Sequence, residues 1–389
     1  MVMILFITAS FLLAGLAVVF GWRLQAALRR FKIHRAFSAP AEAPSVSVCI
    51  PARNETHAMT QCLERVLSSD YRKMEVLVYD DESADDTSIL IKSFAHAGVR
   101  FVTGPALPQN WLGKNHALEV LAREASGTYI LFLDVDTHIN VTTISQIVGY
   151  SMENDLVMTS VIPGRNDVWR ANVLFGHLRY FWQLLLARDD FPAASSSLWM
   201  IKRHVLLRTI GGFAPHKAQV APEVRIAEII GPVAYRCLVN NAQLGVTYEK
   251  RLQSQRETSR RLLYPMVGGT MTGALMGCIV FTLLNLPLFV VISSIVTGWS
   301  PVHTIALTYL VAFGLIYAEY TYAVWRRNWW LGIFVWPIVV LHEFILFITS
   351  TYGYLRHTIT WKGRPVMAPK MANQMSDDVP GTGSDIDRN

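Results

Sequence analysis

Tyr129-Ile-Leu-Phe-Leu-Asp-Val-Asp136 is the stretch that decides the fold, because a fully apolar run ends here in two carboxylates. Five consecutive apolar residues predict a strand covered on both faces, as in the parallel sheets of α/β proteins. Asp134 and Asp136 would then lie at the carboxyl edge of the sheet, where open α/β folds bind ligands. Two carboxylates one residue apart suit a hard divalent cation that takes water and phosphate oxygens as its other ligands. The alternative for an isolated pair is a polar strand end that caps the next helix.

Two further segments repeat this order of strand, polar turn and helix. Residues 44–50 predict a strand that leads into a turn made of Pro51, Ala52, Arg53, Asn54 and Glu55. Residues 74–79 predict another strand, which Asp80-Asp-Glu-Ser-Ala-Asp-Asp-Thr87 follows. Residues 83–87 are typical of a helix N-cap, but capping does not explain the carboxylates of Asp80 and Asp81 at the strand end. Strand, tight turn and helix form half of a nucleotide-binding βαβ unit.

Three strands that end in PARNE, DDESADDT and DVD at one sheet edge resemble the family 2 glycosyltransferases of the GT-A fold. The resemblance implies an α/β domain with a Rossmann-like, mostly parallel central sheet. It also implies a nucleotide-sugar site in which the first two loops, with Asp80 or Asp81, hold the base and ribose. Asp134, Val135 and Asp136 would hold the diphosphate, with Asp134 and Asp136 as ligands of Mg²⁺ or Mn²⁺.

The segment Trp111-Leu-Gly-Lys114 lies between the second and third of these strands. It resembles the membrane-bound subgroup that glycosylates lipids, including the hopanoid-associated, carotenoid and ceramide-type enzymes. Lys114 precedes a predicted helix, where free N–H groups and an ammonium group converge, so it is a candidate phosphate contact.

The composition indicates a membrane protein. Of 389 residues, 52% are hydrophobic and 16% are charged, and the mean hydropathy is +0.29, which is too apolar for an ordinary soluble protein. Residues 3–20 are unbroken and apolar, long enough to cross a bilayer. Basic residues follow at 23–35, which predicts an external N-terminus and a cytoplasmic domain. A cleaved signal peptide is the alternative, but in a signal peptide the basic residues precede the apolar stretch, whereas here they follow it. We expect an integral protein of a bacterial inner membrane.

The net charge of +6 does not predict a nucleic-acid partner. The basic residues stand beside the apolar segments, where they serve topology and contact with anionic lipid headgroups. The predicted partners are a nucleotide-sugar donor, a lipid acceptor and the membrane.

Five parts are predicted along the chain. They are a transmembrane anchor over residues 1–22, a basic juxtamembrane segment and linker over 23–44, the glycosyltransferase domain over 45–261, C-terminal transmembrane helices over 262–355, and a tail over 356–389 that is disordered from about residue 371. If the apolar blocks 266–297, 303–325 and 329–352 each cross once, the tail ends outside. If 266–297 is a tight helix pair broken at Asn285-Leu-Pro287, the tail returns to the cytoplasm. Thr360-Trp-Lys-Gly-Arg-Pro365 favours a cytoplasmic tail, because it resembles a W-x-G-R element of the lipid-glycosylating subgroup.

The segment after Asp136 is expected to build the acceptor site. Ile210-Gly-Gly-Phe213 resembles the family's GGF turn, after which the family presents Glu-Asp with the Asp as base. This chain has Pro222-Glu223, so the resemblance implies Glu223 as the base, with a carboxylate displaced by one methylene. The alternative is a helix-start carboxylate favoured by the helix dipole.

Gln253 and Arg256 stand where processive synthases carry QxxRW, with Glu257 in place of the Trp. Arg256 is a candidate for a bidentate contact with the diphosphate, and Gln253 for the acceptor side of the site. A juxtamembrane basic stripe is the alternative reading of this segment.

The function predicted from these features is a metal-dependent, inverting transfer of a sugar from a nucleotide-sugar to a hydroxyl or carboxyl of a lipid. The family resemblance favours a UDP-hexose as donor. A processive polysaccharide synthase is one alternative, which the missing Trp and the few spans disfavour. A non-catalytic nucleotide-sugar-binding membrane protein is another, motivated by Pro222-Glu223. A transporter is disfavoured because the apolar blocks carry little charge beyond Glu319, His342 and Glu343.

Overall fold

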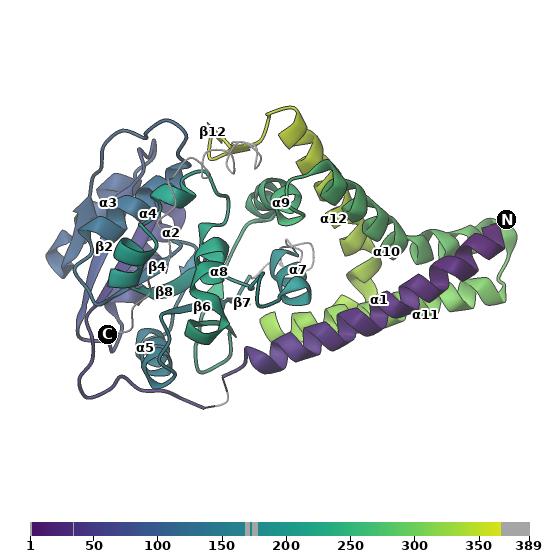
Figure 1. Ribbon diagram of the computed structural model, residues 1–389, viewed down its shortest axis with the longest axis horizontal. Coiled ribbons are helices and arrows are strands. Elements are labelled where there is room, and N and C mark those ends of the chain that lie inside the picture. Colours follow the sequence, from purple (N-terminus) through teal and green to yellow (C-terminus); the bar gives the residue numbers. More distant parts are fainter. Residues whose placement is uncertain (1, 34, 168–171, 173–177, 367–389) are drawn as a thin grey trace.

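The computed structural model describes residues 2–33, 35–167, 172 and 178–366. It has an α/β domain built on a seven-stranded sheet and an arm of long apolar helices (Figure 1). The sheet has the order β3-β2-β1-β4-β8-β6-β9, formed by β1 (Val46–Ala52), β2 (Met74–Asp80), β3 (Val99–Val102), β4 (Tyr129–Leu133), β6 (Met158–Ile162), β8 (Leu198–Lys202) and β9 (Tyr235–Val239). The predicted α/β fold with a mostly parallel sheet is confirmed.

Strands β1, β2 and β4 lie side by side and run parallel, so their carboxyl ends share one edge. Val46 of β1 lies opposite Met74 of β2 on one side and Tyr129 of β4 on the other. β8 runs antiparallel to both β4 and β6. The loops that follow β1, β2 and β4 carry the predicted polar residues, and they meet at this edge as parallel strands require.

Alternate residues of each strand point to opposite faces of the sheet. In β4, Ile130 and Phe132 belong to one core cluster, whereas Leu131 and Leu133 belong to the other. The whole of β4 is buried, because α4 (Gly113–Glu124) covers the first face and α2 (Thr56–Leu67) and α5 (Thr143–Glu153) cover the second. Further elements of the domain are α3 (Thr87–Ser93), η1 (Ala95–Ala97), β5 (Thr137–His138), β7 (Gly164–Arg165), η2 (Val205–Thr209), η3 (Ala214–His216), α8 (Pro222–Ala234) and β10 (Thr247–Tyr248).

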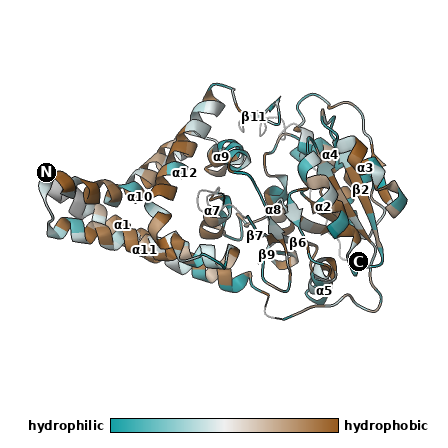
Figure 2. Ribbon diagram, turned by 180° about the vertical axis from the view of Figure 1, so that it is seen from behind, coloured by the Kyte–Doolittle hydropathy of each residue, from teal (hydrophilic) through white to brown (hydrophobic). Residues whose placement is uncertain are grey.

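The arm contains four helices that are long and apolar enough to cross a membrane, and Figure 2 shows apolar residues along them. They are α1 (Val2–Arg30), α10 (Met271–Thr297), α11 (Pro301–Val324) and α12 (Leu331–Leu355). The first helix continues to Arg30, beyond the predicted anchor end at residue 22. Two more helices, α7 (Arg179–Leu186) and α9 (Leu252–Met266), lie between the domain and the arm (Figure 1).

The apolar block 266–297 does not form the tight helix pair that would return the tail to the domain side. α10 is continuous for 27 residues and includes both Asn285 and Pro287. Proline removes one backbone donor from a helix, but neighbouring helices and polar side chains can accommodate this loss in an apolar bundle. Here the Asn285 amide donates a hydrogen bond to the Phe281 carbonyl at 2.8 Å. α10 therefore runs away from the domain, and α11 returns (Figure 1).

Helix α12 lies across the domain end of the arm, so the segment after it remains on the domain side. Its first turn packs closely on α11, because a Cβ on Gly332 would lie 3.2 Å from the Cα of Ala318. Near its other end, Ser350 and Tyr354 donate hydrogen bonds to two backbone carbonyls of α9, each at 2.6 Å. The hairpin of β11 (Thr360–Trp361) and β12 (Arg364–Pro365) follows and contacts the domain. The tail predicted to be disordered from about residue 371 lies outside the described residues.

Candidate active site

A cavity of about 420 Å³ opens at the carboxyl edge of β1 and β4. The loops after the strands form one side of it, and α7, α9 and the β11–β12 hairpin contribute to the other. The structure brings most of the sequence-predicted residues into its wall: Pro51, Ala52, Arg53, Asn54, Glu55, Asp81, Lys114, Asp134, Val135 and Asp136. Four predicted residues are not part of the wall, namely Asp80, Glu223, Gln253 and Arg256.

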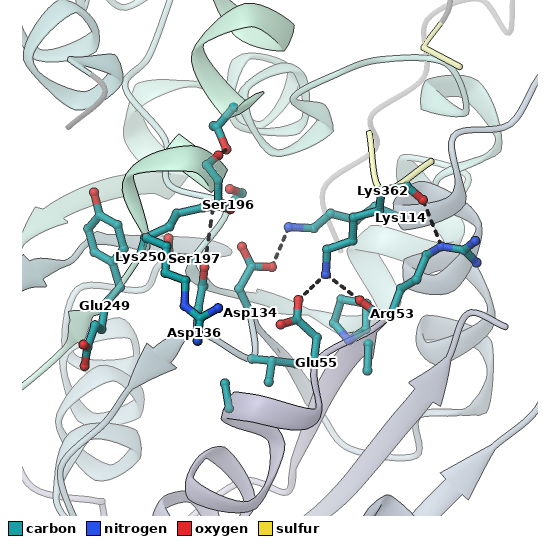
Figure 3. A pocket seen from close by; sticks show the side chains of 18 of the residues that line it. Arg53, Glu55, Lys114, Asp134, Asp136, Ser196, Ser197, Glu249, Lys250 and Lys362 are labelled. Carbon is teal, nitrogen blue, oxygen red and sulfur yellow. Dashed lines mark hydrogen bonds and ion pairs between the residues drawn. The ribbon is translucent and has the colours of Figure 1, made fainter. Parts of the chain in front are cut away.

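The two carboxylates that follow β4 each contact a lysine from another part of the chain. Asp134 lies 2.5 Å from the ammonium group of Lys114, which the first turn of α4 directs into the cavity (Figure 3). Asp136 lies 3.5 Å from the ammonium group of Lys250, which follows β10. The sequence predicted Lys114 but missed Lys250, because nothing near position 250 marks it as a neighbour of β4.

These carboxylates suit a divalent cation that binds together with a nucleotide. Among the described residues, no group of three or more His, Cys, Asp or Glu side chains is placed so that it could hold a metal ion. Mg²⁺ bound with phosphates needs only one or two carboxylates from the protein, because phosphate oxygens and water complete its coordination. Asp134 and Asp136 provide these two carboxylates in one turn, and each forms an ion pair with a lysine, Lys114 or Lys250. The residues present therefore fit a metal–diphosphate complex.

Of the two aspartates after β2, only Asp81 faces the cavity. Asp80 accepts hydrogen bonds from Ser83 at 2.5 Å and from Ser88, so it orders the start of α3 instead. Asp81 is 5% exposed, and its two carboxylate oxygens accept hydrogen bonds from Nη1 of Arg364 at 2.8 and 2.7 Å. Asp81, and not Asp80, is therefore the aspartate that a ligand in the cavity could contact.

The β11–β12 hairpin brings three residues close to the loops after β1 and β2. Lys362 pairs with Glu55 and donates a hydrogen bond to the carbonyl of Arg53 at 2.6 Å (Figure 3). Burial raises the pKa of Glu55, and the contact with Lys362 opposes this rise. Trp361 lines the cavity, and Arg364 binds Asp81. In the sequence, the W-x-G-R element predicted only the side of the membrane on which the tail lies. It was also the available signal that these residues belong to the site.

Glu223 lies behind Arg179 and does not form part of the cavity wall. Glu223 is in the first turn of α8 and is 3% exposed, and one of its oxygens accepts a hydrogen bond from Nη2 of Arg179 at 2.5 Å. Arg179 is the first residue of α7 and lines the cavity. Its Nη1 donates to the hydroxyl of Ser196 at 3.0 Å. The carboxylate predicted as the base is therefore the partner of a buried guanidinium group.

Helix α9 presents a different face to the cavity from the one that the sequence predicted. Gln253 and Arg256 are exposed, whereas Ser254, Thr258 and Arg261 line the cavity. Residues four and seven positions apart lie on one face of a helix, so Ser254, Thr258 and Arg261 face the cavity together. Gln253 and Arg256 lie on another face, away from the cavity. Arg261 is the arginine of α9 that lines the cavity, and its guanidinium group lies 4.9 Å from the ring centre of Trp361.

The charge of the cavity wall suits an anionic ligand. Carboxylates line it at Glu55, Asp81, Asp134, Asp136 and Glu249. The cationic side chains in the wall outnumber these carboxylates. They are Arg53, Lys114, Arg179, Lys250, Arg251, Arg261 and Lys362. A cleft with an excess of one charge attracts ligands of the opposite charge.

Comparison with known proteins finds a family match for the part of the chain that contains the strand loops of this cavity. Residues 47–208 match the family described as Glycosyl transferase family 2. The chain is 26% identical over 131 residues to the UDP-Glc:alpha-D-GlcNAc-diphosphoundecaprenol beta-1,3-glucosyltransferase WfgD of Escherichia coli, covering 34% of this chain and 49% of the relative. It is 33% identical over 96 residues to the 4,4'-diaponeurosporenoate glycosyltransferase of Staphylococcus haemolyticus, covering 25% of each chain. The chain thus spans about half or less of these relatives' lengths.

A solved structure shares the fold over most of the chain. It is a mannosyltransferase from Pyrobaculum calidifontis in complex with GDP-Man and Mn²⁺. The match has a TM-score of 0.56 at 17% identity and covers 90% of this chain and 97% of that one. The similarity therefore includes the helical arm as well as the α/β domain.

Proposed function

We propose that this chain, whose residues 47–208 carry a family 2 glycosyltransferase domain, transfers a sugar from a nucleotide-sugar to a lipid acceptor with inversion at the anomeric carbon. One observation carries the proposal. A single cavity joins the polar loops after the strands, the carboxylates of Asp134 and Asp136, and two helices, α7 and α9, that contact the arm. The E. coli relative, which is named for an acceptor linked to diphosphoundecaprenol, supports a lipid-linked acceptor.

The donor would lie along the carboxyl edge of the sheet. Asp81 and the loop from Pro51 to Glu55 would hold the base and ribose, since they form the end of the cavity beneath the hairpin. Lys114 and Lys250 would bind the diphosphate oxygens, because each ammonium group already lies beside a carboxylate of the same site. Fixed cations at this position stabilise the negative charge that develops on the departing nucleotide.

Asp134 and Asp136 would hold Mg²⁺ or Mn²⁺, which would neutralise part of the charge on the leaving diphosphate. The Pyrobaculum mannosyltransferase was solved with Mn²⁺ and a nucleotide-sugar, which supports this assignment. The chain contributes the two carboxylates, and Lys114 and Lys250 hold them in place through ion pairs.

The arm would place the acceptor beside the donor at the membrane surface. Arg29 and Arg30 lie at the domain end of α1, and Arg326 and Arg327 lie at the domain end of α11. Positive charge on that side favours a cytoplasmic domain and an external N-terminus in an inner membrane. The proposed acceptor would then keep its chain in the bilayer while its headgroup enters the cavity between α7 and α9.

Full-length protein purified in detergent tests this function. Radiolabelled UDP-glucose, UDP-GlcNAc and GDP-mannose would be offered with Mn²⁺ and a total lipid extract. We expect one donor to label a lipid, and Asp136→Asn to lower turnover by about 100-fold. Exposed Glu124 offers the matched control Glu124→Gln, which we expect to leave turnover unchanged. Metal-dependent donor binding without turnover would favour a binding protein, and a ladder of long products would favour a polysaccharide synthase.

A further inference from the structure

We propose that Arg179 and Arg261 bind an acceptor that is already negatively charged, a lipid that ends in a carboxylate or a phosphate, so that the transfer needs no general base. The inference rests on the proposed function and names the acceptor chemistry of the same cavity.

Both arginines have unused hydrogen-bonding capacity beside the cavity. Arg179 is 5% exposed. The Nε atoms of Arg179 and Arg261 are buried and have no hydrogen-bond partner in the part of the chain that the structure describes. Leaving a buried donor unpaired is costly, and more so for a charged group. Both residues line the cavity, and guanidinium groups bind carboxylates and phosphates in a bidentate manner.

The two arginines differ in how their charge is compensated. Glu223 forms an ion pair with Arg179. Among the described residues, Arg261 forms no ion pair with a carboxylate, and its guanidinium group contacts the ring of Trp361 instead. Burial lowers the pKa of Arg261, and the positive charge of Arg179 contributes to this shift. One net positive charge is therefore left for a ligand, which suits a carboxylate or a phosphate headgroup.

The arginines approach the cavity from the side of the arm. Arg179 begins α7, and α7 packs on α1, where Arg23 donates a hydrogen bond to the carbonyl of Leu185 at 3.1 Å. Arg261 belongs to α9, and its carbonyl accepts a hydrogen bond from Tyr354 of α12. Figure 1 shows α7 and α9 between the sheet and the long helices. A headgroup that enters from the membrane would meet these arginines on the side opposite the donor loops.

Four of the five carboxylates of the cavity wall are engaged by cations, and two histidines, His57 and His138, also line it. An acceptor that is already ionised would use none of these groups as a base. An alcohol must lose its proton during attack, and a positioned base contributes to this step. Glu223 is bound to Arg179 outside the wall. The four ion pairs of the wall carboxylates are Glu55 with Lys362, Asp81 with Arg364, Asp134 with Lys114 and Asp136 with Lys250. The fifth, Glu249, is exposed. A carboxylic acid with a pKa of about 4 is already ionised at neutral pH and needs no base.

The reaction balances without a proton transfer. A lone pair of the acceptor oxygen anion forms the bond to the anomeric carbon. The bond from that carbon to the diphosphate oxygen breaks, and its electron pair leaves with the nucleoside diphosphate. The products are a glycosyl ester or a glycosyl phosphate with inverted configuration. Arg179 and Arg261 would offset the cost of moving the anion out of water, and Glu223 would act as a positioning residue for Arg179.

Three probes with the same hydrocarbon chain test the acceptor chemistry on the full-length protein. Geranylgeranoic acid, geranylgeranyl phosphate and geranylgeraniol would be compared with the donor that the protein accepts. We expect transfer to one of the two anions to exceed transfer to the alcohol by about 100-fold. An alkali-labile product would identify the carboxylate, and an acid-labile one the phosphate. We also expect the rate with geranylgeranoic acid to stay flat between pH 6 and 8, because this acid is ionised throughout that range. Preference for the alcohol, or a rate with the acid that rises with pH as a general base would require, would overturn the inference.

Variants separate acceptor binding from general stability. Arg261→Gln and Arg179→Gln are expected to raise the KM for the anionic acceptor about tenfold or more while the KM for the donor stays the same. Arg260→Gln is the matched control, because Arg260 is exposed on the same helix. In the absence of the nucleotide-sugar donor, binding of each lipid probe would be measured from the shift that it causes in the melting temperature of the protein. Equal shifts for the acid and the alcohol would refute the arginine site, whereas failure to bind any nucleotide-sugar would refute the proposed function instead.

Discussion

At position 113, glycine lets the side chains of Arg364 and Asp81 reach the first turn of α4. A Cβ at this position would lie 2.5 Å from Nη1 of Arg364 and 2.7 Å from an oxygen of Asp81. Real Cβ atoms do not approach other atoms so closely, so a side chain here would displace the guanidinium group. The Gly-Lys pair therefore has two roles, since Gly113 admits the hairpin and Lys114 reaches Asp134.

We predict that Gly113→Ala weakens nucleotide binding by about tenfold, because it separates Arg364 from Asp81 and so disorders the base-binding end of the cavity. Folding should not suffer, since alanine is the better helix former. Titration calorimetry with the nucleoside diphosphate and Mn²⁺ would measure the change. Gly15→Ala in α1 is the control, because a Cβ there would meet nothing within 4 Å. Unchanged nucleotide affinity in Gly113→Ala would contradict the proposed role of the hairpin.

Glu223 and Arg179 form a buried ion pair, so removal of one partner leaves an uncompensated charge. We predict that Glu223→Ala lowers the free energy of unfolding by about 3 kcal/mol. The pair of Arg100 and Glu124 is exposed, and Glu124→Ala should change that free energy by less than about 1 kcal/mol. Thermal unfolding in detergent would compare the two variants. Similar losses in both would mean that Glu223 is free in solution to act as a base.

At the scale of elements, α12 and the hairpin link the arm to the loops after β1 and β2. Lys362 contacts Glu55 across 307 positions of sequence, and Arg364 contacts Asp81 across 283. The base of the hairpin packs in an apolar cluster that includes Tyr264 and Tyr354. Because Tyr354 also belongs to α12, this cluster joins that helix to the hairpin.

We predict that both ends of α12 face the same side of the membrane, since both lie at the domain end of the arm. Cysteines placed at exposed Arg327 and Thr358 should react with an impermeant maleimide from the cytoplasmic side. A cysteine at exposed Trp299, in the turn between α10 and α11, should react from the outside. A Cys278→Ser background removes the one native thiol that is not buried. Reaction of position 358 from the same side as position 299 would show that α12 crosses the membrane.

At the scale of the whole molecule, neither part of the chain builds the cavity alone. The α/β domain supplies Asp81, Asp134 and Asp136, and the segments around the arm supply Arg261 and Lys362. One core cluster continues from the sheet into the arm, with Phe132 and Trp336 among its members. The segments next to the arm therefore contribute to the candidate active site.

We predict that metal ions stabilise the whole protein only together with a nucleotide. Lys114 and Lys250 already balance Asp134 and Asp136, so EDTA alone should leave the melting temperature unchanged. Nucleoside diphosphate with Mn²⁺ at 100 times its Kd should add about 2.7 kcal/mol of stability, and EDTA should remove this gain. Differential scanning fluorimetry would follow the effect. A large drop in melting temperature on chelation alone would indicate a structural metal site instead.

The sequence by itself determined the strands, the polar turns after them and the apolar helices, because these depend on local periodicity and turn chemistry. The buried strand 129–133 and the carboxylates after it lie as the pattern predicts. Parallel strands bring their carboxyl ends to one edge, so the cluster of Arg53, Glu55 and Asp134 could also be anticipated.

Only the tertiary structure decided which residues complete the cavity. It selected Asp81 over Asp80, Arg261 over Arg256, and the partner of Glu223. Each of these choices depends on which face of a helix is buried and on contacts between segments far apart in sequence. Local sequence does not encode such contacts, because packing of the arm against the domain fixes the rotation of α9 and the position of the hairpin.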